Sequence, residues 1–440
     1  MARKVFISFL GETNYRYCDY QKDGKSYGNV RFAQEATLNY LNVNELWSQD
    51  DVAIILLTHG AEASNWVDNG QKDKDGKTIT DELTHDTLEG LETRLKRFKI
   101  KPDTIKNLPD GNDEKEIWKI FKSVFERIKD NDELYFDITH GFRYLPMLVL
   151  VLCNYSKFLK KISVKSITYG NFEVARKLGH GLIVDLLPLT QLQDWTYAAG
   201  QYLDSGNVKK MVELKSIVRN EKLNCIIDAL EIVIKERQTC RGKQIHTSEN
   251  LTVLKSALSD YISTKTDDNL EEEPLHHILK EVDTSLKDFD IKTNFMNGFN
   301  AAKWCAENGL FQQAITLLLE NFITLFCERH GFDIKDKDMR DVVGTALSIQ
   351  VNKKQNNKRK WPDDLTEQNI IDIEKVLQDE WVKPIGKHNN DLIHIFRDIR
   401  DYRNNFNHAG FNEGTPNPKE IEEKVNEFVT RTLELFAKVS

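Results

Sequence analysis

The run Val52–Thr58 (VAIILLT) constrains the fold more than any other feature, because its seven residues carry no charge. A continuous apolar run of this length is typical of a strand buried on both faces of a sheet, as in the middle of a parallel sheet. Three further segments, shorter or interrupted by a single charged residue, are also predicted to be strands: Val5–Leu10, Leu134–Thr139 and Val164–Tyr169.

Segments with helical periodicity alternate with these strand candidates. They are Arg31–Leu41, the charged segment Glu82–Phe98, Lys115–Ile128, and the apolar segment Leu145–Phe158 with a proline in its first turn. Alternation of strands and helices predicts a doubly wound, mainly parallel sheet. We therefore expect residues 1–190 to form an α/β, Rossmann-like domain.

The pattern changes near Asp194, after which no convincing strand follows. Long helical periods replace the strands, for example Ala301–Arg329 and Leu392–His408. The 440 residues exceed what one ordinary core accommodates. The sequence therefore predicts a second, all-α domain over residues 191–440.

Composition excludes several classes of protein. The net charge is −8, whereas a constitutive, non-specific nucleic-acid binder is usually basic, so we expect no stable DNA binding. RNA can still be a substrate if its phosphate contacts are concentrated in one groove. The six cysteines form no CxxC pair, and their spacing suits neither a zinc site nor a disulfide scaffold, so no metal is expected. No stretch approaches the roughly 18 apolar residues of a membrane span, and the N-terminal apolar run is too short for a signal segment. These features predict a protein of the reducing cytoplasm.

The segment Asp137–Arg143 (DITHGFR) lies where a predicted strand ends and a predicted helix begins. Ligands of open α/β sheets bind outside the carboxyl ends of the strands, where a helix N-terminus offers free N–H groups to an anion. Gly141 allows close approach of the backbone, Thr139 and His140 can donate hydrogen bonds, and Arg143 can pair with a phosphate.

The segment after the first predicted strand is expected at the same edge, with its candidate residues Gly11, Thr13 and Asn14. Together the two segments predict a pocket for a phosphorylated or nucleotide-like ligand. The competing interpretation is a plain strand–helix turn, with a structural glycine and an arginine in a surface ion pair. No P-loop or complete dinucleotide fingerprint is present to decide between them.

A second candidate site lies near a helix end, in Arg403–His408 (RNNFNH). His408 can move protons near neutral pH, and Arg403 can stabilise charge that develops on a phosphate. Asn404 precedes His408 by four residues and shares its helix face. One helix alone makes a poor compact site, whereas two copies facing each other across a dimer axis make a better one. The competing interpretation is a solvated basic helix end that complements the helix dipole.

A third feature is the basic run Asn352–Lys360 (NKKQNNKRK). Such a run can attract RNA, but we favour a solvated loop, the more frequent occurrence. The templates G-x-S-x-G, HExxH and Walker A are absent.

Taken in order, several segments resemble one family. VFISFLG, RFAQEA, VAIILLT, DITHGFR and ITYG resemble the CARF sensor domains of CRISPR-associated proteins. VDLLPLTQLQDWTYAAGQYLDSG resembles the junction that follows those domains, and WCAENGLFQQAITLLLE and YRNNFNH resemble their HEPN ribonuclease domain. The whole chain is thus similar to the CARF–HEPN ancillary ribonucleases of type III CRISPR systems, of the Csm/Csx type.

This resemblance implies a homodimer whose paired CARF domains bind a cyclic oligoadenylate and whose paired HEPN domains cut single-stranded RNA without a metal or other cofactor. Arg403, Asn404 and His408 match the HEPN motif, and the loop Thr139–Arg143 matches the loop that faces the activator. The products would be a 2′,3′-cyclic phosphate and a 5′-hydroxyl.

The ring size of the activator is less constrained by the resemblance. A two-fold pocket suits even rings, and among these the resemblance favours cyclic tetra-adenylate, with hexa-adenylate second. The loop lacks the Gly-Lys sequence of some CARF domains, which leaves both the ring size and cleavage of the ring open.

Two alternatives remain at this point. The first is a non-catalytic CARF sensor whose helical domain only binds RNA or a protein, against which the Arg-x4-His pattern argues. The second is a ring nuclease that degrades the cyclic oligoadenylate in the CARF pocket, and this activity is compatible with RNA cleavage.

Overall fold

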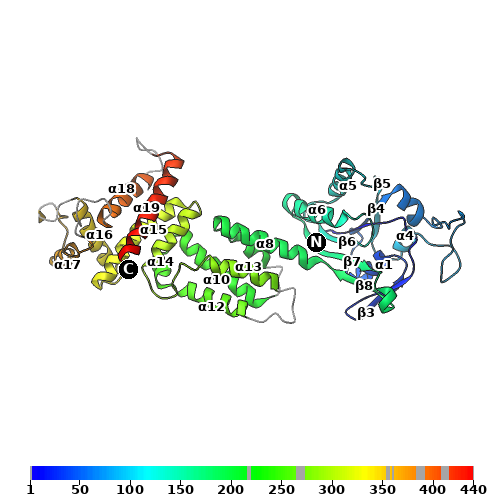
Figure 1. Cartoon of the computed structure of the whole chain (residues 1–440), viewed down its shortest axis with the longest axis horizontal. Coiled ribbons are helices and arrows are strands. Elements are labelled where there is room, and N and C mark those ends of the chain that lie inside the picture. The colour runs from blue at the N-terminus through cyan, green and yellow to red at the C-terminus, as the bar shows by residue number, and fades with distance from the viewer. Residues whose placement is uncertain are drawn as a thin grey trace. The chain divides into compact units, whose positions relative to one another are not determined.

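A computed structural model describes residues 2–215, 220–263, 273–352, 357–358, 361–382, 392–407 and 416–439. The chain divides into two compact units, Met1–Gln191 and Leu192–Ser440 (Figure 1). The helix α8 (Leu187–Ser205) carries the chain from the first unit into the second.

The first unit is built on one eight-stranded sheet of order β3-β2-β8-β7-β6-β1-β4-β5. The strands β7, β6, β1, β4 and β5 run parallel to one another, whereas β8 pairs antiparallel with β7. The parallel α/β fold is therefore confirmed. The strand bounds are β1 Lys4–Phe9, β2 Cys18–Lys22, β3 Lys25–Val30, β4 Val52–Thr58, β5 Lys101–Leu108, β6 Glu133–Asp137, β7 Ser163–Asn171 and β8 Gly181–Asp185.

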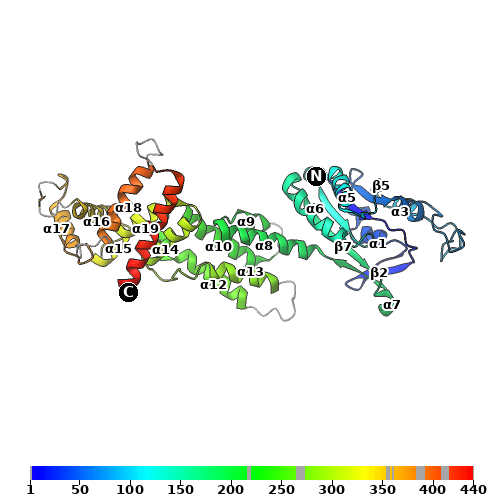
Figure 2. The same cartoon turned by 45° about the horizontal axis from the view of Figure 1, so that its top comes forward.

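Helices cover both faces of the sheet (Figures 1 and 2). Successive residues of β1 point to opposite faces: Val5 and Ile7 pack in the core beneath α5 and α6, and Phe6 packs in the core beneath α1 and α4. The helix bounds are α1 Ala33–Tyr40, α2 Val43–Leu46, α3 His59–Ala61, η1 Glu62–Trp66, α4 Leu91–Leu95, α5 Glu114–Arg127, α6 Leu145–Lys160 and α7 Ala175–Leu178.

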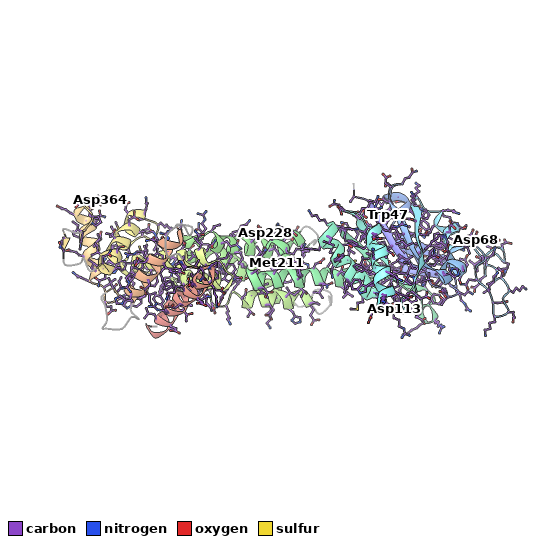
Figure 3. The ribbon with its side chains drawn as sticks, turned by 90° about the horizontal axis from the view of Figure 1, so that it is seen from above. Trp47, Asp68, Asp113, Met211, Asp228 and Asp364 are labelled. Carbon is purple, nitrogen blue, oxygen red and sulfur yellow. The ribbon has the colours of Figure 1, made fainter. Side chains whose placement is uncertain are left out.

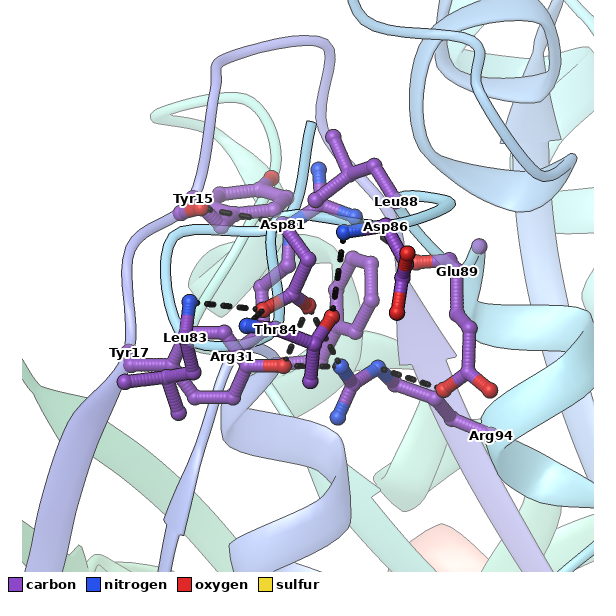
Figure 4. Close-up of polar contacts among 12 residues, drawn as sticks. Tyr15, Tyr17, Arg31, Asp81, Leu83, Thr84, Asp86, Leu88, Glu89 and Arg94 are labelled. Carbon is purple, nitrogen blue, oxygen red and sulfur yellow. Dashed lines mark hydrogen bonds and ion pairs between the residues drawn. The ribbon is translucent and has the colours of Figure 1, made fainter. Parts of the chain in front are cut away.

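The helix predicted over Glu82–Phe98 is mostly wrong, because only α4 is helical there. The carboxylate of Asp81 accepts hydrogen bonds from the backbone N–H groups of Leu83 and Thr84 and pairs with the buried Arg94 (Figure 4). An Asp side chain that binds nearby N–H groups offers the backbone an alternative to the helix.

Four strands were missed by the sequence interpretation: β2, β3, β5 and β8. Three of them, β2, β3 and β5, are polar, and two of these are the end strands of the sheet. An end strand is half exposed and carries charges that blunt its open edge, so it lacks the apolar run by which a buried strand is recognised.

The second unit is helical, and none of its described residues lies in a strand. One apolar core runs through it; Met211, labelled in Figure 3, is fully buried there, and Phe299, Phe322 and Phe436 pack edge to face or stacked. The helices are α8, α9 Lys209–Lys215, α10 Glu221–Gln238, α11 Gly242–Thr247, α12 Glu249–Ser263, α13 Glu273–Thr284, α14 Met296–Glu307, α15 Phe311–His330, α16 Lys337–Val351, α17 Glu367–Leu377, α18 Leu392–Asn407 and α19 Pro418–Val439.

The single helix predicted over Ala301–Arg329 is in fact two, α14 and α15. Gly309 stands between them with a φ of +71°, a left-handed conformation that ends a helix and that glycine adopts without strain. The basic run Asn352–Lys360 falls largely outside the described residues. In the part of the chain that the structure describes, no helix is long and apolar enough to cross a membrane.

Candidate functional site

The two loops predicted to share a pocket do meet at the carboxyl edge of the sheet. Strand β1 pairs in parallel with β6, so the loops that follow them emerge side by side. A cavity of about 550 Å³ lies between these loops, and it is called here the smaller edge cavity. Of the predicted site residues it is lined by Gly11, Thr13, Thr139, His140 and Gly141.

A second space, the larger edge cavity of about 1050 Å³, adjoins the first. Thr13, Thr139 and His140 line both cavities, and Asn14 lines the larger one. Arg143 lines neither cavity; its side chain is exposed just before α6. The structure therefore brings six of the seven predicted residues together, and Arg143 follows directly on Phe142, which lines the smaller edge cavity.

The hydroxyl of Thr139 holds the strand ends in place. It donates a hydrogen bond to Asp137 Oδ1 and accepts one, of 2.7 Å, from the N–H of Gly170 in β7. A threonine hydroxyl has only one hydrogen to donate. Thr139 can therefore accept a hydrogen bond from a ligand but cannot donate one in this arrangement, contrary to the expectation from sequence.

His140 contributes a neutral polar group to both cavities. Its ring packs against Tyr15 with centroids 4.1 Å apart, and its buried Nε2 has no hydrogen-bond partner in the described structure. Burial lowers the pKa of His140 to about 4, because a charged imidazole would lose its hydration. At neutral pH the ring therefore offers a hydrogen bond and a stacking face, and no positive charge.

Gly141 is required by the local backbone. Its φ is +118°, and a Cβ at this position would collide with the side chain of Leu145 and crowd Phe9. Any other residue would be strained here and would push against the first turn of α6. The glycine thus allows the loop to pack closely on its own helix. The sequence interpretation had instead explained this glycine by the close approach of a ligand.

Asp137 should make the stability of the protein fall as pH rises. Burial raises its pKa to about 6, with Thr139 opposing the shift, whereas the unfolded side chain titrates near 3.8. The folded state thus holds its proton to higher pH than the unfolded state, so stability is lost between these values and stays lost above them. Asn cannot ionise, yet it still accepts at Oδ1. The free energy of unfolding of Asp137→Asn should therefore rise by about 2.4 kcal/mol relative to that of wild type between about pH 4 and pH 7.5. Chemical denaturation of both proteins at the two pH values measures this difference. The contribution of His140 is present in both proteins and therefore cancels from the comparison. A constant difference would show that Asp137 is ionised throughout.

The sequence interpretation missed a second layer of residues behind the Gly11–Tyr15 loop, namely Arg31, Asn65 and Gln71. Their side chains are buried, and they donate hydrogen bonds to backbone carbonyls of that loop. No local pattern marks them, because they come from three segments that only the folded chain brings together.

In the second unit, Arg403 lines a cavity of about 670 Å³, called here the α18 cavity. Phe396, Arg400 and Arg403 follow one another at spacings of four and three residues, so all three lie on one face of α18 and line this cavity. Arg340 of α16 lines it from another side. The sequence interpretation had named Arg403 and had missed the other two arginines.

The three arginines of the α18 cavity differ in their partners. Arg340 pairs with Glu320 at 2.9 Å, and Arg400 pairs with the neighbouring Asp401 at 2.9 Å. The Nε of Arg403 is buried and makes no hydrogen bond within the described residues. Among the described residues, Arg403 is thus the one of the three that no carboxylate pairs with, so its charge is available to a bound anion.

The other two residues of the predicted RNA site are less well placed. Asn404 is exposed and does not line the α18 cavity, and His408 lies outside the described residues. Among the residues that are described, no three His, Cys, Asp or Glu side chains gather as metal ligands would.

Comparisons with known proteins bear on the first unit. Residues 5–173 match the family model described as the CARF domain of the CRISPR system endoribonuclease Csx1. The CRISPR-associated protein MJ1674 of Methanocaldococcus jannaschii is 25% identical over 303 residues, which cover 66% of this chain and 45% of MJ1674. The chain thus matches less than half the length of that relative. The structure of Enterococcus italicus Csm6 bound to cyclic hexa-2′-fluoro-hexa-dAMP aligns with 100% of this chain and 94% of its own, at 11% identity and a TM-score of 0.43.

Proposed function

We propose that this CRISPR ancillary protein, whose first unit is a CARF domain, is a metal-independent endoribonuclease. A cyclic oligoadenylate activates it, and it acts in type III CRISPR antiviral defence. The match of residues 5–173 to the CARF domain of an endoribonuclease carries this proposal, and the binding site is the pair of edge cavities that this domain contains. The substrate is single-stranded RNA.

The chemistry of the edge cavities suits a cyclic oligoadenylate. Such a ligand carries one phosphate and one adenine per nucleotide. The exposed Arg143 can pair with a phosphate, the neutral His140 and Tyr15 offer aromatic faces, and the Nε2 of His140 offers an unpaired polar atom. An even ring matches a pocket shared by two copies, and the resemblance to the family then favours cyclic tetra-adenylate, with hexa-adenylate second.

The α18 cavity supplies the cleavage site in this proposal. The 2′-oxygen of the RNA bonds to the adjacent phosphorus while the bond from phosphorus to the 5′-oxygen breaks. The 2′-hydroxyl loses its proton and the leaving 5′-oxygen gains one, which yields a 2′,3′-cyclic phosphate and a 5′-hydroxyl. Arg403 stabilises the charge that builds up on the phosphate, and His408 either transfers a proton or positions the phosphate. Asn404 would complete the site beside them.

The decisive experiment incubates the purified chain with labelled single-stranded RNA and EDTA, with and without cyclic tri-, tetra- and hexa-adenylate. We expect RNA cleavage only when one of the rings is present. Following the ring itself by chromatography in the same reactions detects ring cleavage. An intact RNA in every reaction, or cleavage that EDTA abolishes, would contradict the proposal.

A homodimer is expected because α6 presents an uncovered apolar stripe. Met147, Val151, Tyr155 and Phe158 are 71%, 46%, 45% and 83% exposed, and their spacing of four, four and three residues places them on one face. α6 begins directly after the Thr139–Arg143 loop, so a second copy seated on this stripe brings two such loops together. We therefore take the second copy to be the occupant.

Light scattering tests this stripe. Wild type should be a dimer, and the double variant Val151→Glu, Phe158→Glu should be a monomer at the same concentration, whereas Lys122→Glu on exposed α5 should stay a dimer. A wild-type monomer that is fully active at that concentration would exclude the shared site.

A further inference from the structure

The loop that follows β1 is held from behind by three buried side chains. Arg31, Asn65 and Gln71 are 3%, 0% and 7% exposed and come from three different segments. They donate hydrogen bonds to four backbone carbonyls of the loop. Asn65 Nδ2 donates to Gly11 O at 2.9 Å and to Thr13 O at 2.8 Å. Gln71 Nε2 donates to Glu12 O at 3.0 Å, and Arg31 Nε donates to Tyr15 O at 3.2 Å. We call these three side chains the carbonyl clamp.

Asn65 is the centre of the clamp. While its Nδ2 donates to two carbonyls, its Oδ1 accepts from Arg31 Nη2 at 2.9 Å and from Gln71 Nε2 at 3.1 Å. A side-chain amide has two donor hydrogens and two acceptor lone pairs, so every polar position of Asn65 is used. The orientation of its amide is therefore set by four partners at once.

The clamp decides which side of the loop faces the ligand. Asn65 and Gln71 line neither edge cavity, so the carbonyls that they bind point into the domain. In a trans peptide the N–H points opposite to the C=O. The N–H groups of Glu12, Thr13 and Asn14 therefore point to the other side, and none of them makes a hydrogen bond among the described residues. Successive free N–H groups form a concave site for an anion.

Arg31 adds charge to this arrangement. Its guanidinium donates only to neutral oxygens, those of Tyr15, Glu89 and Asn65, and it lines the larger edge cavity. Its charge is therefore not cancelled by a carboxylate in direct contact within the described structure. A phosphate bound over the loop would supply the missing negative charge.

We propose that the carbonyl clamp presets the Gly11–Tyr15 loop as a phosphate-binding element of the activator site, by turning carbonyl oxygens inward and N–H groups outward. The inference rests on the proposed function, because the anion is taken to be a phosphate of the cyclic oligoadenylate. Asn65 is a positioning residue in this account, since it acts through the loop and does not touch the ligand.

Asn65→Asp tests the proposal with little change of shape. A carboxylate at this position can still accept from Arg31 and Gln71, but it repels the carbonyls of Gly11 and Thr13 in place of binding them. We expect the dissociation constant for cyclic tetra-adenylate, measured by calorimetry on the full chain, to rise about tenfold or more, since two donated hydrogen bonds are lost. Tryptic cleavage after the exposed Arg16 at the end of this loop should also become faster in the folded protein.

A matched control is Asp51→Ala at the opposite edge of the sheet. Asp51 is 4% exposed and accepts from the N–H groups of Lys4 and Ser48, before β1 and β4. This variant should lose stability without a change in affinity or in the rate of tryptic cleavage after Arg16.

The outcomes separate the two claims. If wild type binds the ring but Asn65→Asp binds it equally well, or if the rate of tryptic cleavage after Arg16 is unchanged, the clamp does not preset the loop. If wild type binds none of cyclic tri-, tetra- and hexa-adenylate, the proposed function fails, and the cleavage rates after Arg16 alone decide whether the clamp orders the loop.

Discussion

Arg403→Ala should lower the rate of activated RNA cleavage by at least about 100-fold, the usual loss when one donor to a developing negative charge is removed. Arg403 lines the α18 cavity, and no carboxylate among the described residues pairs with its guanidinium, so the side chain is available to a phosphate. Its removal breaks no ion pair among these residues and should leave the fold intact. His408→Ala should have an effect of similar size if it transfers the proton.

Single-turnover cleavage of labelled RNA at saturating activator measures this loss, with circular dichroism to confirm folding. The matched control is Arg397→Ala on the same helix; Arg397 pairs with Asp398 and does not line the cavity. Because Arg403 makes no contact with the activator in this proposal, the affinity for cyclic tetra-adenylate should be unchanged. Wild-type cleavage by both Arg403→Ala and His408→Ala would move the cleavage site elsewhere in the protein.

Arg143→Ala should raise the concentration of cyclic tetra-adenylate needed for half-maximal activation by about tenfold or more. An exposed guanidinium one residue beyond the lining of the smaller edge cavity can bind a phosphate by charge-assisted hydrogen bonds, which contribute about 1.5–3 kcal/mol. The cleavage rate at saturating activator should recover, in contrast to Arg403→Ala, because a lost binding contact is compensated by more ligand.

A titration of cleavage rate against activator concentration distinguishes the two behaviours. Lys122→Ala, which removes an exposed charge from α5 of the same unit, serves as the control and should follow the wild-type curve. If Arg143→Ala lowered the maximal rate and left the half-maximal concentration unchanged, Arg143 would act on the switch between states and not on binding of the ring.

The candidate site could be anticipated in part. Gly11, Thr13, Asn14, Thr139, His140 and Gly141 were placed at one edge because they follow strand candidates, and parallel strands end at a common edge. The detailed roles of Thr139 and Gly141 could not be anticipated in this way. The hydroxyl of Thr139 donates its only hydrogen to Asp137, and Gly141 is required because its backbone packs closely on Leu145. Both contacts depend on the folded backbone.

The sequence by itself determined the two-part architecture. Apolar runs such as Val52–Thr58 can only be buried between two layers, and amphipathic periods such as that of α5 need an apolar surface to cover. These are local properties, visible in the order of residues along the chain. The polar end strands were not predicted, because their side chains face solvent and therefore lack the apolar pattern of a buried strand.

Only the tertiary structure decided which polar side chains act together. Asn65 contacts residues 54 and 52 positions away, and Arg340 lines the α18 cavity with Arg403 of another helix. Such contacts link positions that share no periodicity and no local motif. A buried amide or guanidinium is tolerated where its hydrogen bonds are satisfied, and those partners exist only once the separate segments are packed against each other.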